Sequence, residues 1–105
     1  MQPKTGNKPI EITIEDIANS LGVIIDCRSS EEYELSHMDN AINIPLQHLS
    51  IRQDSFPCRK EDTFFVYCKT GNRSNTFILY LRSIGYSNCQ SIAGGFESLR
   101  ETKTC

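Results

Sequence analysis

The sequence lacks the features that mark secreted and membrane proteins. Its 105 residues include no tryptophan, and no apolar run approaches the ~20 residues that a membrane-spanning helix requires. Residues 1–9 are polar and contain no apolar segment of signal-peptide length. These absences favour a soluble, cytoplasmic chain and give no reason to expect a membrane partner.

Neither sign of charge is in clear excess. Lys and Arg together number 11 and Asp and Glu number 13, which gives a net charge of -2. Such a balance provides no general attraction to nucleic acid or to an anionic membrane surface. We therefore expect no nucleic-acid partner, and any site for an anion must be local.

The five cysteines follow neither a disulfide pattern nor a zinc pattern. There is no Cys-x-x-Cys pair, and neither histidine is close enough to a cysteine for zinc spacing. We expect no metal and no cofactor. Cys27 and Cys89 lie in or beside apolar runs and are interpreted as small buried hydrophobic residues, whereas Cys58 and Cys105 are interpreted as incidental.

The length fits one domain over residues 1–105, with its core at about 10–101 and a polar N-terminal extension at 1–9. A domain of this size buries ~65% of the surface that its unfolded chain exposes. The core therefore needs no partner, and a monomer or weak dimer is expected.

Apolar runs alternate with helical patterns along the chain. Strands are predicted at 10–12, 23–25, 41–44, 64–67 and 90–92, and helices at 13–20, 31–35, about 76–84 and 96–101, with one or two helical turns at 46–51 and an exposed connection at 52–62. Short connections between alternating strands and helices indicate a parallel α/β sheet with right-handed crossovers and helices on both faces.

The helix after the fourth strand has the clearest pattern. Phe77, Tyr80, Leu81 and Ile84 have the i, i+3, i+4, i+7 spacing of one apolar face, and Gly85 follows where a left-handed cap is common. Earlier in the chain, Ser29 or Ser30 can cap the helix at 31–35.

Two polar clusters follow apolar strands. Asp26-Cys27-Arg28 follows the strand at 23–25, and Cys68 follows the strand at 64–67. Ligand sites of open α/β sheets form outside the carboxyl ends of the strands. Both clusters are therefore expected at one edge of the sheet.

The loop that begins at Cys68 has the composition of a thiolate site. Backbone N–H groups and the first turn of the following helix can stabilise an anion, and Gly71 permits a turn with positive φ. A free thiol pKa of ~8.5 falls to ~3.5–7.5 in such surroundings. Cys68 is the predicted nucleophile, and the predicted substrate-binding residues are Lys69, Thr70, Gly71, Asn72, Arg73 and Ser74.

Single residues of this loop have specific expected roles. Lys69 and Arg73 would attract an anionic donor and stabilise an anionic leaving group. The Thr70 and Ser74 hydroxyls can donate to sulfur or to oxygens of the substrate, although Ser74 is equally well explained as a helix cap.

These motifs resemble those of the rhodanese-like sulfurtransferases over about residues 10–100. Five patterns occur in the family's order and spacing: Asp26-x-Arg28, Glu32-Tyr33 to His37 with Ala41 to Pro45, Tyr67-Cys68-x-x-Gly71-x-Arg73-Ser74, Gly85-Tyr86, and Gly94-Gly95. The departures are Ser36, Asp39-Asn40, Thr76-Phe77 and Phe96, and none of them removes a chemical group from the proposed site.

The resemblance implies a mainly parallel five-stranded rhodanese-like sheet and a sulfurtransferase activity. Cys68 would take a sulfane sulfur from thiosulfate or a persulfide donor, carry it as a persulfide, and pass it to cyanide or a thiol. A small anionic sulfur donor is the expected substrate. Glutathione or a thioredoxin-like protein is a candidate thiol acceptor.

Two alternatives remain beside this interpretation. Non-catalytic rhodanese-like modules for regulation or docking usually lose the cysteine or shrink the loop, whereas this chain retains Cys68, Gly71 and Arg73. Cysteine-dependent phosphatases have Cys-x5-Arg loops, whereas four residues separate Cys68 from Arg73. Sulfur transfer is favoured over both.

Three polar residues outside the loop are predicted to form a structural framework. Asp26 and Arg28 form a charged pair at a strand end, where such pairs more often fix a loop than contact substrate. His37 could act as a base, but its turn-rich surroundings favour a structural hydrogen bond.

Overall fold

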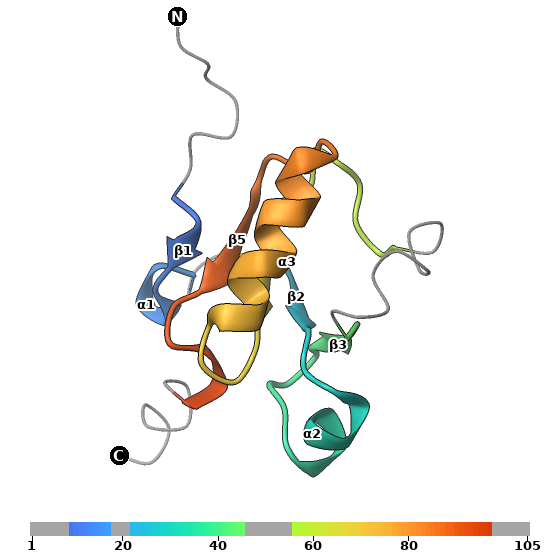
Figure 1. Cartoon of the computed structure of the whole chain (residues 1–105), viewed down its shortest axis with the longest axis vertical. Coiled ribbons are helices and arrows are strands. Elements are labelled where there is room, and N and C mark those ends of the chain that lie inside the picture. Colours follow the sequence, from blue (N-terminus) through green and yellow to red (C-terminus); the bar gives the residue numbers. More distant parts are fainter. Residues whose placement is uncertain (1–8, 18–21, 46–55, 98–105) are drawn as a thin grey trace, which may run out of the picture.

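A computed structural model of the protein describes residues 9–17, 22–45 and 56–97. Five strands form a single sheet, and every neighbouring pair is parallel (Figure 1). The strands are β1 (Glu11–Ile12), β2 (Val23–Asp26), β3 (Ile42–Asn43), β4 (Phe64–Tyr67) and β5 (Cys89–Ile92), in the order β1-β5-β4-β2-β3. The predicted parallel α/β fold is confirmed.

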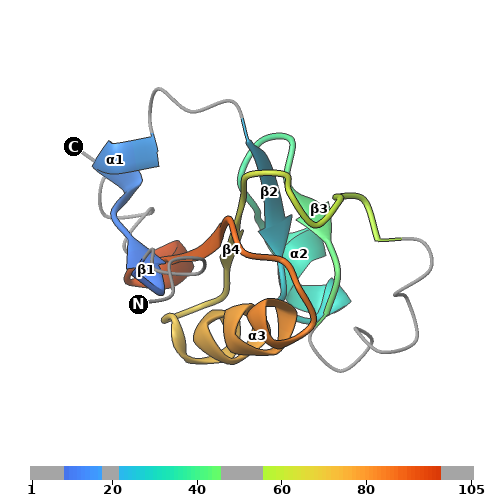
Figure 2. The same ribbon diagram turned by 90° about the horizontal axis from the view of Figure 1, so that it is seen from above.

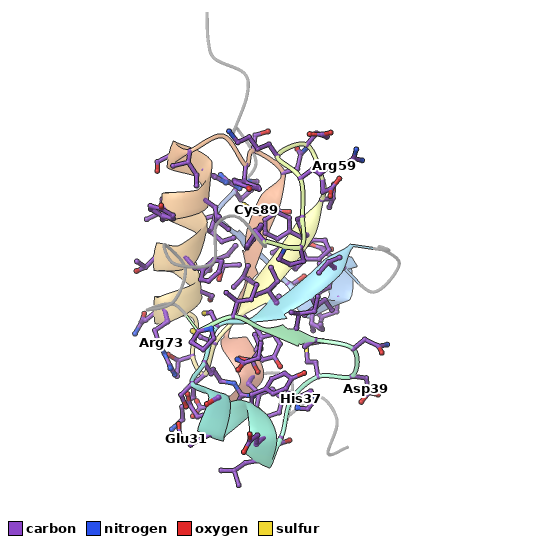
Figure 3. The ribbon with its side chains drawn as sticks, turned by 90° about the vertical axis from the view of Figure 1, so that its right-hand side faces the viewer. Glu31, His37, Asp39, Arg59, Arg73 and Cys89 are labelled. Carbon is purple, nitrogen blue, oxygen red and sulfur yellow. The ribbon has the colours of Figure 1, made fainter. Side chains whose placement is uncertain are left out.

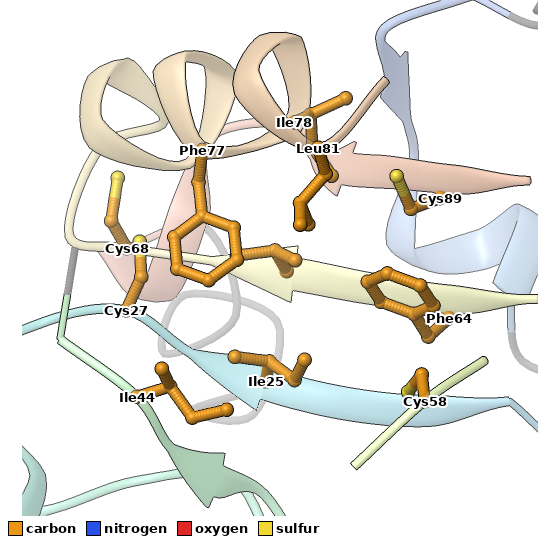
Figure 4. Packing of buried hydrophobic residues seen from close by; sticks show 11 residues of the cluster. Ile25, Cys27, Ile44, Cys58, Phe64, Cys68, Phe77, Ile78, Leu81 and Cys89 are labelled. Atoms are coloured by element: carbon orange, nitrogen blue, oxygen red, sulfur yellow. The ribbon is translucent and has the colours of Figure 1, made fainter. Parts of the chain in front are cut away.

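Apolar side chains cover both faces of the sheet. Successive residues of a strand point to opposite faces, and β2 and β4 are apolar at nearly every position. On one face, Phe77, Ile78 and Leu81 of α3 (Asn72–Ser83) pack against the sheet (Figure 4). On the other, Ile14 and Ile17 of α1 (Ile14–Ile17) and Tyr33 of α2 (Ser30–Leu35) join a second cluster. Figure 2 shows α3 on one side of β4 and β2.

The helix α2 begins with the predicted serine cap. Ser29 accepts a hydrogen bond from the Glu32 N–H, and the Glu32 carboxylate accepts one from the Ser29 N–H at 3.0 Å. This reciprocal capping box fixes the start of a short helix that buries none of its residues. Glu32 is thereby held at a defined place beside the end of β2.

The helix α3 begins four positions earlier than the apolar pattern predicts, at Asn72 instead of about Thr76. Its first turn is polar and therefore has no apolar periodicity. The predicted cap role of Ser74 is also wrong, because Gly71 is the N-cap and Ser74 lies inside the helix. The C-terminal end agrees with prediction, because Tyr86 N–H donates to Leu81 O and Gly85 N–H to Arg82 O, the two bonds of a Schellman motif.

The predicted exposed connection at 52–62 is confirmed at residues 57 and 59–61, which are exposed, and wrong at Cys58. Cys58 is buried, and Phe56 makes edge contacts with Phe64 and Tyr86. The segment therefore closes one end of the core. The helical turns expected at 46–51 lie outside the described residues, as do the ends of the helices expected at 13–20 and 96–101; residues 95–97 are helical. Within the described residues, no helix is long and apolar enough to cross a membrane.

Candidate active site

Cys68 is the first residue after β4 and begins the short loop that leads into α3 (Figure 4). Its Sγ accepts hydrogen bonds from the Gly71 N–H at 3.0 Å and the Ser74 N–H at 3.3 Å. Gly71 has a φ of 113°, a left-handed value that turns its N–H back towards the sulfur. The predicted ring of backbone donors is present in these two groups.

The Ser74 hydroxyl is a third polar group at the sulfur. Its Oγ lies 3.6 Å from Cys68 Sγ and 2.6 Å from the Ser91 Oγ. Because Ser91 lies on β5, the hydroxyl pair connects the sulfur with the neighbouring strand. In the structure the Cys68 thiol donates to Ser74 Oγ, and the Ser74 hydroxyl lies 3.2 Å from Gly71 O. When Cys68 is ionised, the Ser74 hydroxyl can instead donate to the sulfur while Ser91 donates to Ser74.

The surroundings of Cys68 stabilise its thiolate. The neighbouring Cys27 thiol, followed by the Ser74 and Gly71 groups, lowers the pKa of Cys68 to about 4 despite its burial. The N-terminal end of α3 adds a positive dipole on the same side. At neutral pH the sulfur is therefore an anion, the form required of a nucleophile.

Residues 94–97, here called the closing segment, contact the backbone of the active-site loop. Phe96 N–H donates to Cys68 O at 2.7 Å, and Glu97 N–H donates to Lys69 O at 3.1 Å. A Cβ on Gly95 would lie 2.5 Å from Cys68 O, so only glycine permits this approach. The Gly94-Gly95 signature is explained by this contact between two distant segments.

Arg73 does not extend freely towards a substrate. Its guanidinium binds the Glu32 carboxylate through two contacts, 3.1 Å from Nη1 to Oε1 and 3.4 Å from Nη2 to Oε2. This pair lowers the pKa of Glu32 to about 2. The positive charge of Arg73 is therefore largely compensated in the structure, and its predicted contact with an anionic donor stays a prediction.

The remaining loop residues lie at the surface. Lys69, Thr70 and Asn72 are exposed, and Lys69 has no ion pair within the described part of the chain. Their predicted substrate contacts stay predictions. Lys69 is the loop cation that remains available to an anion.

Asp26 and Arg28 form a buried pair at the end of β2. Arg28 Nη2 lies 2.7 Å from Asp26 Oδ2, and its guanidinium carbon lies 4.4 Å from the centre of the Phe96 ring. The same guanidinium donates to Ser36 O. These contacts join β2, α2 and the closing segment, which is the geometry that the predicted framework role requires.

His37 lies beside α2, away from Arg73 (Figure 3). Its ring stacks on Tyr33 with centroids 3.7 Å apart, and its Nδ1 lies 2.7 Å from the Tyr33 carbonyl oxygen. This hydrogen-bonded position fits the predicted structural role and not that of a base at the sulfur.

Comparison with known proteins shows the family of this chain. Residues 13–102 match the rhodanese-like domain family. The chain belongs to this family. This rhodanese-like domain is 35% identical over 79 residues to the thiosulfate sulfurtransferase PspE of Escherichia coli strain K12, a match that covers 75% of each protein.

The other relatives include one much longer protein and two of similar length. It is 36% identical over 89 residues to the adenylyltransferase and sulfurtransferase uba4 of Ogataea parapolymorpha, covering 84% of the chain and 23% of that protein. A rhodanese-related protein of Thermoplasma volcanium superposes with a TM-score of 0.79 at 25% identity, covering 89% of this chain and 92% of that one. The human single-domain sulfurtransferase TSTD1 shares the fold, with a TM-score of 0.79 at 21% identity, 91% coverage of this chain and 99% of the other.

Three residues at the site were not assigned to it from the sequence. They are Cys27 as a neighbour of the nucleophile, Glu32 as the partner of Arg73, and Ser91 behind Ser74. Cys27 follows from the order of the strands in the structure, because two residues that each follow a central strand become neighbours when those strands pair. Among the described residues, no group of three or more His, Cys, Asp or Glu side chains could hold a metal ion.

Proposed function

We propose that this rhodanese-like domain is a sulfurtransferase in which Cys68 carries the sulfur. The supporting observation is that the Gly71 N–H and the Ser74 N–H both donate to Cys68 Sγ, with the Ser74 Oγ 3.6 Å from the same atom. These donors stabilise negative charge on one sulfur atom. They favour the thiolate before the reaction and again when Cys68 departs as a leaving group.

The proposed reaction is a double displacement. The Cys68 thiolate attacks the outer sulfur of thiosulfate, its S–S bond breaks, and sulfite leaves with the bonding electron pair. Cyanide or a thiolate then attacks the outer sulfur of the persulfide, and the Cys68 thiolate leaves. The products are thiocyanate or a new persulfide, and each step conserves charge without an external oxidant or reductant.

Lys69 is the proposed contact for the anionic donor. It is exposed, adjacent to Cys68 and without a carboxylate partner in the described part of the chain. A single compact ammonium suits a small anion such as thiosulfate and its leaving group sulfite. Glutathione or a thioredoxin-like protein is the proposed class of thiol acceptor.

One observation favours a second candidate, a non-catalytic rhodanese-like module. Cys68 is only 1% exposed, so the loop surrounds its sulfur closely. A regulatory domain would need no access to that atom. The low pKa of Cys68 favours the catalytic assignment, because a docking surface has no use for a buried thiolate.

A cysteine-dependent phosphatase is less well supported. Arg73 would have to bind phosphate, but its guanidinium is held by Glu32. The two N–H donors converge on Sγ itself in a loop with four residues between Cys68 and Arg73. This arrangement suits a single sulfur atom better than a tetrahedral phosphate.

Steady-state assays test the proposal. We expect thiocyanate formation from thiosulfate and cyanide by the wild-type protein, loss of this activity in Cys68→Ser, and retention in the matched control Cys58→Ala, which removes a buried thiol elsewhere. An activity equal to that of Cys68→Ser in the wild-type protein would contradict it. Hydrolysis of an aryl phosphate that depends on Cys68 would instead support the phosphatase.

A further inference from the structure

Cys27 lies beside the nucleophile on the neighbouring strand. β2 and β4 pair with Asp26 opposite Tyr67, and the Cys27 N–H donates to the Tyr67 carbonyl at 3.0 Å. The next pair of residues across these strands is therefore Cys27 and Cys68. Neighbouring strands lie about 4.8 Å apart, so this register brings the two residues close together.

Both thiols extend to the same side of the sheet. Cys27 and Cys68 belong to the core cluster beneath α3, and each is 1% exposed. Figure 4 shows their side chains next to each other, beside Phe77. The two thiols therefore lie side by side in a buried part of the core.

Cys27 approaches the sulfur from the strand side, whereas the other donors come from the loop and α3. Within the part of the chain that the structure describes, no other group is placed to accept a hydrogen bond from the Cys27 thiol, and Cys68 is its neighbour in the core cluster. A thiol is a weak donor, and a neighbouring thiolate is the strongest acceptor that it can find in an apolar core.

Of the two thiols, Cys27 keeps its proton and Cys68 is ionised. Both thiols are buried, and two adjacent negative charges would repel each other. The neighbouring Cys68 thiol, followed by burial, raises the pKa of Cys27 far above that of a free thiol. Cys27 thus keeps its proton while Cys68 is ionised, which also excludes Cys27 as the nucleophile.

The charged and titratable groups near the pair are mostly engaged with one another. They are Asp26 of β2 with Arg28, Arg73 of α3 with Glu32 of α2, Glu11 of β1 with Asn75, Tyr67 of β4 with the Met38 N–H, and the exposed Lys69. None of them is a proton donor to Cys68 Sγ in the structure. The local donors therefore determine the state of the sulfur.

We propose that Cys27 is a positioning residue for sulfur transfer, which donates its thiol proton in a hydrogen bond to Cys68 Sγ and holds the nucleophile as a thiolate. This inference rests on the proposed function and extends it. The bond is strongest when Sγ carries full negative charge, before sulfur is taken up and after it is passed on. Cys27 therefore favours departure of the Cys68 thiolate from the persulfide.

The test is the pH dependence of Cys68 alkylation by iodoacetamide in the full-length protein. The tryptic peptide 61–69 contains Cys68 as its only cysteine, so mass spectrometry follows this residue alone. Cys27→Ala and Cys27→Val remove the donor, and valine also fills the space. Cys27→Ser keeps a donor, and Cys89→Ala is a control for the loss of another buried thiol from the same cluster.

We expect the alkylation midpoint to rise by about one to two pH units in Cys27→Ala and Cys27→Val, the shift that corresponds to loss of a hydrogen bond to a charged group. Cys27→Ser should keep most of the wild-type midpoint, and Cys89→Ala should keep all of it. Circular dichroism verifies that each variant is folded.

A wild-type midpoint in both Cys27→Ala and Cys27→Val would overturn the inference, as would an equal rise in Cys89→Ala. Alkylation needs no sulfur donor, so the result is independent of sulfur transfer. A shifted midpoint together with failure of the wild-type protein to form a persulfide would contradict the proposed function and leave the Cys27 hydrogen bond standing.

Discussion

The ion pair between Arg73 and Glu32 controls how much positive charge the active-site loop presents. Both side chains are partly exposed, at 40% and 32%. The carboxylate neutralises the guanidinium and fixes its direction, while it also caps α2. One residue therefore couples the start of a helix to the electrostatics of the site.

Replacing Glu32 with Gln tests this coupling at the residue scale. Glutamine keeps the capping box but removes the charge, so Arg73 becomes an uncompensated cation. We expect the KM for thiosulfate to fall roughly two- to fivefold, because the exchanged charge lies at a partly exposed site. Glu31→Gln, an exposed change on the same helix, serves as the control.

A rise in KM for Glu32→Gln would contradict this account, because it would mean that Glu32 orients Arg73 for the substrate.

The pH dependence of the free energy of unfolding gives a second test of the Glu32 and Arg73 pair. The depressed pKa of Glu32 means that the pair stabilises the fold above about pH 4.3, the ordinary value of Glu, and that this contribution is lost as pH falls towards about 2. The Tm difference between wild type and Glu32→Gln should shrink over that range.

Lys69 is predicted to supply the attraction for an anionic donor. We expect Lys69→Ala to raise the KM for thiosulfate roughly two- to fivefold at low salt, with kcat little changed. The effect should shrink as ionic strength rises, because an exposed charge is screened. Lys60→Ala, which lies at the far end of α3 beside Gly85, is the control. Equal KM values for the two variants would remove Lys69 from the site.

At the scale of elements, the active-site loop is held between the first turn of α3 and the closing segment. Two N–H groups of the closing segment bind carbonyls of the loop, at 2.7 Å and 3.1 Å. The loop is therefore a fixed part of the fold, and its donors are in place before a substrate arrives. Such preorganisation avoids rearrangement during the reaction.

Gly95→Ala tests the closing contact. The new Cβ would lie 2.5 Å from Cys68 O and 2.6 Å from Lys69 O, and the φ of 63° adds strain. We expect a loss of about 1–3 kcal/mol in unfolding free energy, measured by urea titration, together with loss of sulfurtransferase activity.

Gly85→Ala is the matched control for Gly95→Ala. Gly85 also has a positive φ, of 112°, but its nearest neighbour is the flexible Lys60 side chain at the opposite end of α3. It should lose about 1–2 kcal/mol and keep its activity per folded molecule. Full activity in Gly95→Ala would show that the closing contact does not position the loop.

The sequence predicts the elements better than the contacts between them. The strand at 64–67 and the C-terminal end of α3 agree with prediction because apolar runs and a glycine cap are local signals. The start of α3 was missed because its first turn, Asn72 to Asn75, is polar. The Glu32 and Arg73 pair, 41 positions apart, follows only from tertiary structure.

The contact between Cys27 and Cys68 illustrates the same limit. Its cause is the pairing of β2 with β4, although β3 lies between them in sequence. Burial of Cys27 was predicted correctly from its apolar neighbours. Its partner was not, because the order of strands in a parallel sheet has no local sequence signal.

At the scale of the whole molecule, the order β1-β5-β4-β2-β3 places the ends of β2 and β4 side by side in the middle of the sheet. Cys68, Cys27 and the pair of Asp26 with Arg28 therefore share one edge. The core beneath α3 supports this edge at one end, where Phe77 lies beside Cys68, and extends to Phe64 at the other (Figure 4).

Two phenylalanine substitutions separate support of the site from general stability. Phe64 and Phe77 are both fully buried, so Phe64→Ala and Phe77→Ala should each cost about 3–5 kcal/mol, measured by urea titration. Phe77→Ala should also reduce kcat per folded molecule by about tenfold or more, because it removes packing behind both thiols. Equal kcat values in the two variants would show that Phe77 has no specific role at the site.

The most direct test of the central claim is the mass of the Cys68 peptide after incubation with thiosulfate. If Cys68 carries the sulfur, tryptic peptide 61–69 should gain ~32 Da, one sulfur atom, and cyanide should remove it. Cys68→Ser should gain nothing. Absence of the added mass in the wild-type protein, or its presence on a cysteine other than Cys68, would contradict the account.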